Sequence, residues 1–169
     1  ALAVMVGADP ARVAASLAAF TGVDRRMQLL GERQLSGGTV RVYDDYGHHP
    51  TEVDVTLRAL RSFEKPEQRG GRLICVFQPH QHSRTRHLLE EFADTLATAD
   101  EVVLAPIYAA SEDPIPGITA ERLAQAVAAR RGTPVRVVGG VDDIPAAVAD
   151  LARPGDLVIT LGAGSIGTV

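Results

Sequence analysis

From residue 40 onward, short apolar runs alternate with stretches of helical periodicity. The apolar runs are residues 40–43, 73–77, 101–108, 135–138 and 156–161, and the helical patterns fall near 50–63, 84–98, 119–131 and 142–152. Runs that are apolar almost throughout are typical of strands buried on both faces, which occur in parallel sheets covered by helices. The alternation therefore predicts a doubly wound, mostly parallel α/β sheet with right-handed crossovers and helices on both faces.

The first two helical patterns each have one apolar side. It consists of Val53, Leu57, Leu60 and Phe63 in the first, and of Leu88, Leu89, Phe92 and Leu96 in the second. Side chains at this spacing share one face of a helix. We expect these faces to form the helical side of the core.

The residues before this alternation predict a short helical segment and a pair of strands. The elements are helices over residues 1–6 and 10–20, a connector over 21–26, and strands over 28–35 and 39–43. Asp9 and Pro10 give the second helix its N-cap and its first position. Val13, Leu17 and Phe20 give it an apolar face.

Composition narrows the classes of function. The net charge of −4 gives no basic stripe of the kind that binds nucleic acid, and no apolar stretch approaches the roughly 18 residues of a membrane span. The single cysteine, Cys75, lies in an apolar run, which indicates a buried core thiol and fits a reducing cytoplasm. The chain begins without Met and stops where a helix should start, so we expect a piece of a longer, cytoplasmic protein.

The most polar segment of the chain is Asp-Asp-Tyr-Gly-His-His-Pro-Thr-Glu, residues 44–52. It follows one predicted strand and leads into a proline-led helix. Asp45, Tyr46 and His48 offer an acceptor, a hydroxyl and a titratable imidazole within one loop, which is typical of a binding or catalytic site. The alternative is structural: Asp44 or Asp45 would cap the helix, and the histidines would be surface residues.

A second cluster, Phe-Gln-Pro-His-Gln-His-Ser-Arg-Thr-Arg at residues 77–86, follows the next predicted strand. Arg84 and Arg86 fall in the first turn of a helix, where the helix dipole disfavours cations. This placement favours a bound anion, since a guanidinium binds a carboxylate or phosphate through paired hydrogen bonds. A pair of surface arginines is the alternative. Both clusters follow the carboxyl ends of strands, where ligands bind in doubly wound sheets.

All five histidines fall between residues 48 and 87. Such a group could hold zinc with an open position, but no cysteine joins it and no carboxylate has a spacing that matches a known site. We therefore expect no metal site made by this chain alone.

The segment Gly-Ala-Gly-Ser-Ile-Gly, residues 162–167, fits the dinucleotide-binding pattern G-x-G-x-x-G after a strand. It comes at the end of the chain, so no second strand and no ribose-binding acid follow it. The position favours a tight strand-to-helix turn over a dinucleotide site. Residues 112–119, with two prolines and a glycine, are expected to form a rigid loop at the same edge of the sheet.

Taken together, these motifs resemble the carboxyl-terminal part of the Mur ligase family. The resemblance is carried, in order along the chain, by residues 20–32, 44–53, 77–86, 111–119 and 155–169. It implies a three-domain protein with a UDP-binding domain, a central ATPase and a Rossmann-like carboxyl-terminal domain. Residues 1–24 would be the last helices of the central domain, and residues 25–169 the third domain. The family's phosphate-binding loop, of the type G-x-x-x-x-G-K-[ST], is absent from this sequence.

The resemblance implies an ATP-dependent ligase of peptidoglycan synthesis that joins L-alanine to UDP-N-acetylmuramate through an acyl phosphate. ATP and Mg²⁺ would be bound mainly by the missing central domain, so this chain alone is expected to be inactive. By motif, Arg26 would contact a phosphate of ATP and Asp45 its ribose. The incoming alanine would be bound by Tyr46, His48, His80 and Arg84. His48 and Arg84 would be the catalytic residues, with Arg84 on the alanine carboxylate.

One departure from the family pattern concerns Gln81 and His82, which stand where the family usually has a basic residue and an aromatic one. His82 would replace the basic residue only in part. Two alternatives stay open: a murein tripeptide ligase with the same chemistry, and a stand-alone dinucleotide-binding module. In a ligase, residues 21–26 would be a hinge that closes the third domain over ATP.

Overall fold

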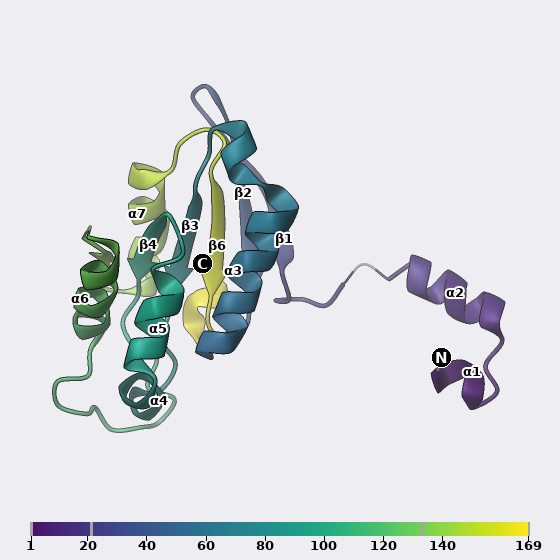
Figure 1. Ribbon diagram of the computed structural model, residues 1–169, viewed down its shortest axis with the longest axis horizontal. Coiled ribbons are helices and arrows are strands. Elements are labelled where there is room, and N and C mark those ends of the chain that lie inside the picture. Colours follow the sequence, from purple (N-terminus) through teal and green to yellow (C-terminus); the bar gives the residue numbers. More distant parts are fainter. Residues whose placement is uncertain (1, 21, 133, 169) are drawn as a thin grey trace.

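One sheet carries both polar clusters. In the computed structural model, residues 2–20, 22–132 and 134–168 are described, and they form six strands in the order β1-β2-β6-β3-β4-β5 (Figure 1). The strands are β1 (Gln28–Leu35), β2 (Gly38–Asp45), β3 (Leu73–Phe77), β4 (Glu101–Leu104), β5 (Arg136–Val137) and β6 (Leu157–Leu161). β1 is antiparallel to β2, and the other neighbouring pairs in the described residues are parallel. The predicted mostly parallel sheet is confirmed.

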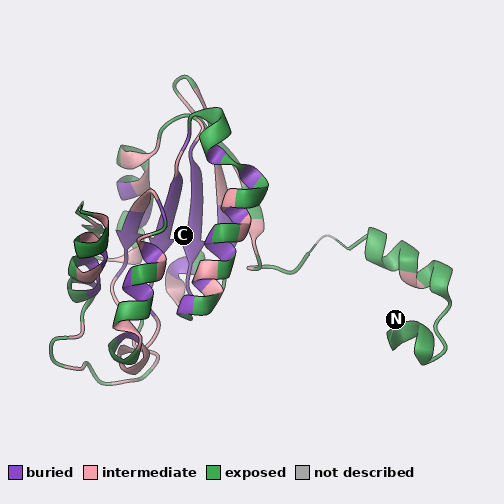
Figure 2. Ribbon diagram, in the orientation of Figure 1, coloured by how far each residue is buried: buried purple, intermediate pink, exposed green. Residues whose placement is uncertain are grey.

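Side chains alternate between two faces of this sheet, and helices cover both. Leu73, Cys75 and Phe77 of β3 belong to a core formed with α3 (Pro50–Glu64), α5 (Leu89–Leu96) and α6 (Ala120–Arg131), whereas Ile74 and Val76 belong to a core formed with α7 (Ile144–Leu151). The central strands are buried between these layers (Figure 2). Burial also raises the pKa of the Cys75 thiol to about 12, as expected of a core cysteine.

The core-facing side of α3 differs from the prediction at its end. Val53, Leu57 and Leu60 are buried as expected, but Phe63 is 76% exposed. Glu64 takes the inward position instead, because its carboxylate accepts hydrogen bonds from the hydroxyl of Tyr43 at 2.5 Å and from Arg41 at 2.6 Å. Polar contacts with Arg41 and Tyr43 of β2 therefore decide which side chain at the end of α3 turns inward.

The helix predicted over residues 84–98 is two helices, α4 (His82–His87) and α5. Leu88 separates them with φ −117° and ψ 26°, outside the helical region. Leu88 and Leu89 both pack against the core. On one straight helix, side chains at neighbouring positions point about 100° apart, so the two could not easily face the same core. The break gives α4 its own direction at the edge of the sheet.

Two strands are shorter than their apolar runs. β4 ends at Leu104 rather than at residue 108, because Pro106 has no N–H to donate to a neighbouring strand. β5 is reduced to Arg136–Val137. The residues after Leu104 instead form a loop at the carboxyl edge, where Tyr108 makes an isolated bridge with His80.

The first helices, α1 (Leu2–Met5) and α2 (Pro10–Ala18), lie away from the sheet (Figure 1). Asp9 caps α2 as predicted by accepting hydrogen bonds from two amides of its first turn. Neither helix has a buried residue among those described, and Leu17 and Phe20 are 69% and 64% exposed. Ala1 and Thr21, which the predicted first helix and connector include, lie outside the described residues, as do Thr133 and Val169. No helix of the described residues is long and apolar enough to cross a membrane.

Candidate functional site

The carboxyl ends of β2, β6 and β3 lie side by side at one edge of the sheet. β6 pairs with both β2 and β3, so the two polar clusters are separated by the width of a single strand. The ring centroids of His48, from the first cluster, and His80, from the second, are 5.5 Å apart. The structure therefore brings together the two clusters that the sequence places at strand ends.

The first cluster enters α3 through a capping box. The imidazole of His49, the N-cap, accepts from the amide of Thr51, and the carboxylate of Glu52 accepts from the amides of His48 and His49 at 3.0 and 3.1 Å. Burial acts to raise the pKa of Glu52, but these amide hydrogen bonds hold it below its usual value. The alternative in which an aspartate caps this helix is wrong, and the aspartates are engaged elsewhere.

Asp44 is buried at the end of β2 with both carboxylate oxygens hydrogen-bonded. Oδ1 accepts from the hydroxyl of Thr160 at 2.7 Å, and Oδ2 accepts from Nε of Arg25 at 2.9 Å. Arg25 also donates from Nη2 to the carbonyl oxygen of Gly162 at 2.5 Å. The sequence did not single out Arg25, whose one signal was its place next to Arg26.

Asp45 is also buried, and its two oxygens accept from backbone amides. Those amides belong to Met27 and Gly47, each at 2.7 Å. Asp45 and Arg26, the two residues assigned to ATP, line one cavity of about 420 Å³ against the first turns of α3. Arg26 is exposed, and none of the ion pairs within the described ranges involves it. Its charge is available to a phosphate.

Tyr46 and His48 project from the same loop with their rings nearly perpendicular, at a centroid distance of 5.4 Å. Nδ1 of His48 lies 3.1 Å from the carbonyl oxygen of Tyr46, which can only accept. That contact assigns the proton of the neutral imidazole to Nδ1 and leaves Nε2 as the acceptor.

In the second cluster, His80 and Arg84 contact each other. Nη1 of Arg84 lies 3.1 Å from Nδ1 of His80, so the guanidinium donates and Nε2 of His80 carries the proton. Burial and the charge of Arg84 lower the pKa of His80. On its other side the ring of His80 stacks on Tyr108, with centroids 5.7 Å apart. Tyr108, a residue that the sequence interpretation missed, ends the apolar run of β4 and so lies at the same edge.

The start of α4 is held by the loop that follows β4. The amide and the hydroxyl of Ser83 donate to the two oxygens of Glu112 at 2.9 and 2.5 Å. The hydrogen bonds from Ser83 also lower the pKa of Glu112. Gln81 has a left-handed backbone, with φ 71°, and its amide donates to the carbonyl of Tyr108. These contacts fix the helix turn that carries Arg84.

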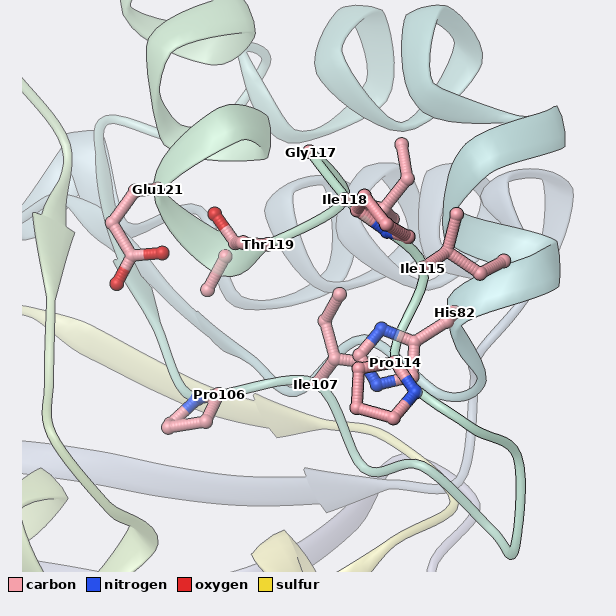
Figure 3. A pocket seen from close by; sticks show the side chains of 11 residues that line it. His82, Pro106, Ile107, Pro114, Ile115, Gly117, Ile118, Thr119 and Glu121 are labelled. Carbon is pink, nitrogen blue, oxygen red and sulfur yellow. The ribbon is translucent and has the colours of Figure 1, made fainter.

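His82 does not join His80 and Arg84. Its ring lines a separate cavity of about 440 Å³, formed by the loop after β4 and the start of α6 (Figure 3). Most of the lining is apolar, with Ile107, Ile115 and Ile118 among it. Arg86 is exposed and likewise lies outside the cluster. Of the second cluster, His80 approaches the first through the ring of His48, and Arg84 contacts His80.

The glycine-rich segment after β6 is a tight turn, as favoured by its position. It leads into a 3₁₀ turn, Ser165–Thr168, and the side chain of Gln78 accepts from the amide of Ile166 at 3.0 Å. A Cβ at Gly164 would lie 2.6 Å from both Gln78 and Tyr108, so the space above this turn is filled by protein. A pyrophosphate would have to displace these side chains.

Within the described residues, no three histidine, cysteine, aspartate or glutamate side chains gather in a way that could hold a metal ion. The fold and the edge define an α/β domain whose strand ends present arginines, histidines and buried aspartates around an open surface. The chain belongs to the family described as Mur ligase, glutamate ligase domain, whose model matches residues 25–164.

Relatives extend over nearly the whole chain. A UDP-N-acetylmuramate–L-alanine ligase of Streptomyces avermitilis is 45% identical over 163 residues, which are 96% of this chain and 33% of the relative. An enzyme of the same name from Cutibacterium acnes is 49% identical over 150 residues, or 89% of this chain and 30% of the relative. The chain thus spans about a third of the length of these relatives.

Solved structures agree on the fold. The UDP-N-acetylmuramate-alanine ligase of Thermotoga maritima superposes with a TM-score of 0.75 over 98% of this chain and 32% of its own, at 24% identity. A domain of a ligase from Haemophilus ducreyi gives a TM-score of 0.57 at 26% identity, over 85% of this chain and 92% of its own.

Proposed function

We propose that this chain is the amino-acid-binding domain of an ATP-dependent ligase that joins L-alanine to UDP-N-acetylmuramate. The observation that carries the proposal is the meeting of two groups at one sheet edge. His48, in contact with Tyr46, approaches His80, which is in contact with Arg84, while Arg26 and Asp45 line a neighbouring cavity. The names and the 42–49% identity of the relatives support the choice of substrates.

The amino acid would bind between the two clusters. Arg84 makes no ion pair with a carboxylate in the described part of the chain, so its guanidinium can accept the carboxylate of alanine in two-point fashion. The alanine amine must lose a proton before it attacks an acyl phosphate. Nε2 of His48, the acceptor nitrogen of that ring, is suited to take it. The side chains of His80 and Tyr46 would line the sides of this alanine site.

The nucleotide would approach the cavity beside α3. Arg26 would neutralise a phosphate there, and Asp45, held rigid by two amides, keeps lone pairs that can accept from ribose hydroxyls. When bound, ATP supplies the phosphoryl group that activates the muramate carboxylate. As the family resemblance implies, Mg²⁺ would be bound mainly by the central domain of the full-length protein. Catalysis at such a site depends on positioning and on charge stabilisation.

The domain boundary follows from the same proposal. Residues 1–24 would be the last helices of the central domain, which accounts for the exposed apolar side chains of α2. The connector over residues 21–26 would be the hinge. A crystal structure of the full-length protein with and without nucleotide tests this, and an unchanged interdomain angle contradicts it.

The proposal is tested in the full-length protein with Arg84→Ala. The KM for L-alanine is expected to rise about tenfold, equivalent to about 1.4 kcal/mol, because a charge-assisted contact to the carboxylate is lost. Arg86→Ala is the matched control, since Arg86 is exposed two residues away. An unchanged KM in Arg84→Ala removes this residue from the role.

Two other functions are separated by simple assays. A murein tripeptide ligase would use a tripeptide in preference to L-alanine, so comparing the two substrates decides between these activities. A dinucleotide-binding module would bind NAD tightly in calorimetry, and the filled turn at Gly164 argues against it.

A further inference from the structure

We infer that Arg25 is a positioning residue of this site, which fixes Tyr46 and the turn from which Arg26 projects. The inference rests on the proposed function for what the site binds. It rests on the structure alone for the way the site is held together.

The guanidinium of Arg25 joins three chain segments at the carboxyl edge. Arg25 lies in the segment that precedes β1. Its guanidinium pairs with Asp44 at the end of β2 and donates to the carbonyl of Gly162, which follows β6. A Cβ at Gly167 would lie 2.4 Å from the Cζ atom of Arg25, so the backbone of the final turn packs directly against the guanidinium. The last glycine of the G-x-G-x-x-G pattern is thus accounted for by Arg25, with no nucleotide involved.

The same guanidinium supports Tyr46. Its Cζ atom lies 5.0 Å from the centroid of the Tyr46 ring, and the amide of Tyr46 donates to the carbonyl of Arg25 at 2.8 Å. Cations at this distance from an aromatic face are attracted to it. Tyr46 is 38% exposed, and its other ring contacts are the guanidinium of Arg26, 5.7 Å from the centroid, and the edge-on ring of His48, so loss of Arg25 removes the nearer of the two cations that support the ring.

The backbone around Arg25 is strained in a way that needs such an anchor. Arg25 and Met27 have φ of 56° and 45°, the left-handed region that is unfavourable for residues other than glycine. Backbone strain of this kind persists only where surrounding contacts impose it, and it gathers at functional sites. Here Asp44 holds the side chain of Arg25 and Asp45 holds the amide of Met27. Arg26, between them, is thereby aimed at the cavity that it shares with Asp45.

The experiment compares Arg25→Gln with wild type in the full-length protein. The KM for L-alanine is expected to rise about tenfold, the KM for ATP to rise as well, and kcat to change less, because orientation of the binding groups is lost. Arg58→Gln is the control, since it removes an exposed arginine paired within α3. Adding guanidinium ion at a non-denaturing concentration to Arg25→Gly is expected to restore part of the loss.

Stability is separated from positioning with a double variant, Arg25→Gln with Asp44→Asn. It removes the buried charge that Arg25→Gln would leave unpaired, so it is expected to recover thermal stability but not the KM for L-alanine. A KM that returns to the wild-type value in the double variant overturns the inference. So does an unchanged KM in a folded Arg25→Gln protein.

Hydrogen exchange keeps the test independent of the proposed reaction. The amides of Tyr46 and Met27 should exchange faster in Arg25→Gln, while those of Cys75 and Ile159 in the core strands stay protected. If the wild-type protein does not ligate L-alanine, the proposed function fails, and this measurement still decides the role of Arg25. Unchanged protection at Tyr46 and Met27 then refutes it.

Discussion

The two edges of the sheet use the same residue types for opposite purposes. At the amino-terminal edge, Arg72 pairs with Asp156 and with Glu101, each at 2.8 Å, and its remaining contact is the carbonyl of Leu151. At the carboxyl edge Arg25 is paired with Asp44, but Arg26 and Arg84 have no carboxylate partner within the described residues. Charge that the protein neutralises itself is structural, and charge left open at a strand end is available to a ligand.

A second network at the amino-terminal edge also neutralises its own charges. The carboxylate of Glu64 is almost fully buried and accepts from Tyr43, Arg41 and Arg69. Burial acts to raise the pKa of Glu64, but these three donors lower it below its usual value. Both oxygens of Glu64 are engaged, and the charges of Arg41 and Arg69 are paired with it.

The largest expected effect is the loss of stability in Arg72→Ala. The substitution leaves the carboxylate of Asp156 buried without its cation, and the free energy of unfolding is expected to fall by about 3–5 kcal/mol. Urea denaturation measures it, with Arg58→Ala as a surface control. A loss close to that of the control would mean that the amino-terminal pairs are not structural.

Tyr43→Phe has the next largest expected effect. It removes one hydrogen bond to a charged acceptor and should cost about 1.5–3 kcal/mol. In the wild type, burial and the bond to Glu64 raise the pKa of Tyr43 to about 12, above its value of about 10 in the unfolded chain. The folded state holds this proton more tightly, so the stabilisation is complete below about pH 10 and is lost as the pH rises to about 12. Tyr43→Phe should lack that loss, and parallel pH profiles would contradict the assignment.

Tyr108→Ala should act on binding and less on stability. Loss of the stacked ring frees His80, and the KM for L-alanine in the full-length protein is expected to rise about two- to fivefold, from the roughly 0.5–1 kcal/mol of such a ring contact. Tyr108→Phe keeps the ring and should match wild type. Equal effects of the two substitutions would assign the role to the hydroxyl.

The smallest expected effect on stability is that of Arg84→Ala. Arg84→Ala should change the free energy of unfolding by no more than about 0.5 kcal/mol, because its partner His80 is neutral and remains in contact with Tyr108. The same substitution carries the predicted rise in KM. A large destabilisation would place Arg84 with the structural arginines of the other edge.

Much of the fold and the location of the candidate site could be predicted from the sequence, because local patterns decide local structure. Apolar runs gave the strands, and the position of both clusters at strand ends gave the edge on which they meet. The details that depend on distant partners could not be predicted. Glu64 displaces Phe63 from the core through Tyr43 and Arg41, and Arg25 joins the site through Asp44 and Gly162. No local pattern encodes such contacts between segments.

The place of β6 has a consequence for how the site comes into being. β6 is the last strand of the described chain, yet it lies between β2 and β3, more than a hundred residues after β2 and about eighty after β3. During synthesis the two polar clusters are made before the strand that sets their separation. Contacts of such long sequence separation form slowly. Until β6 inserts, β2 and β3 each have an open edge and the two polar clusters have no fixed separation, so the site cannot form before β6 is in place.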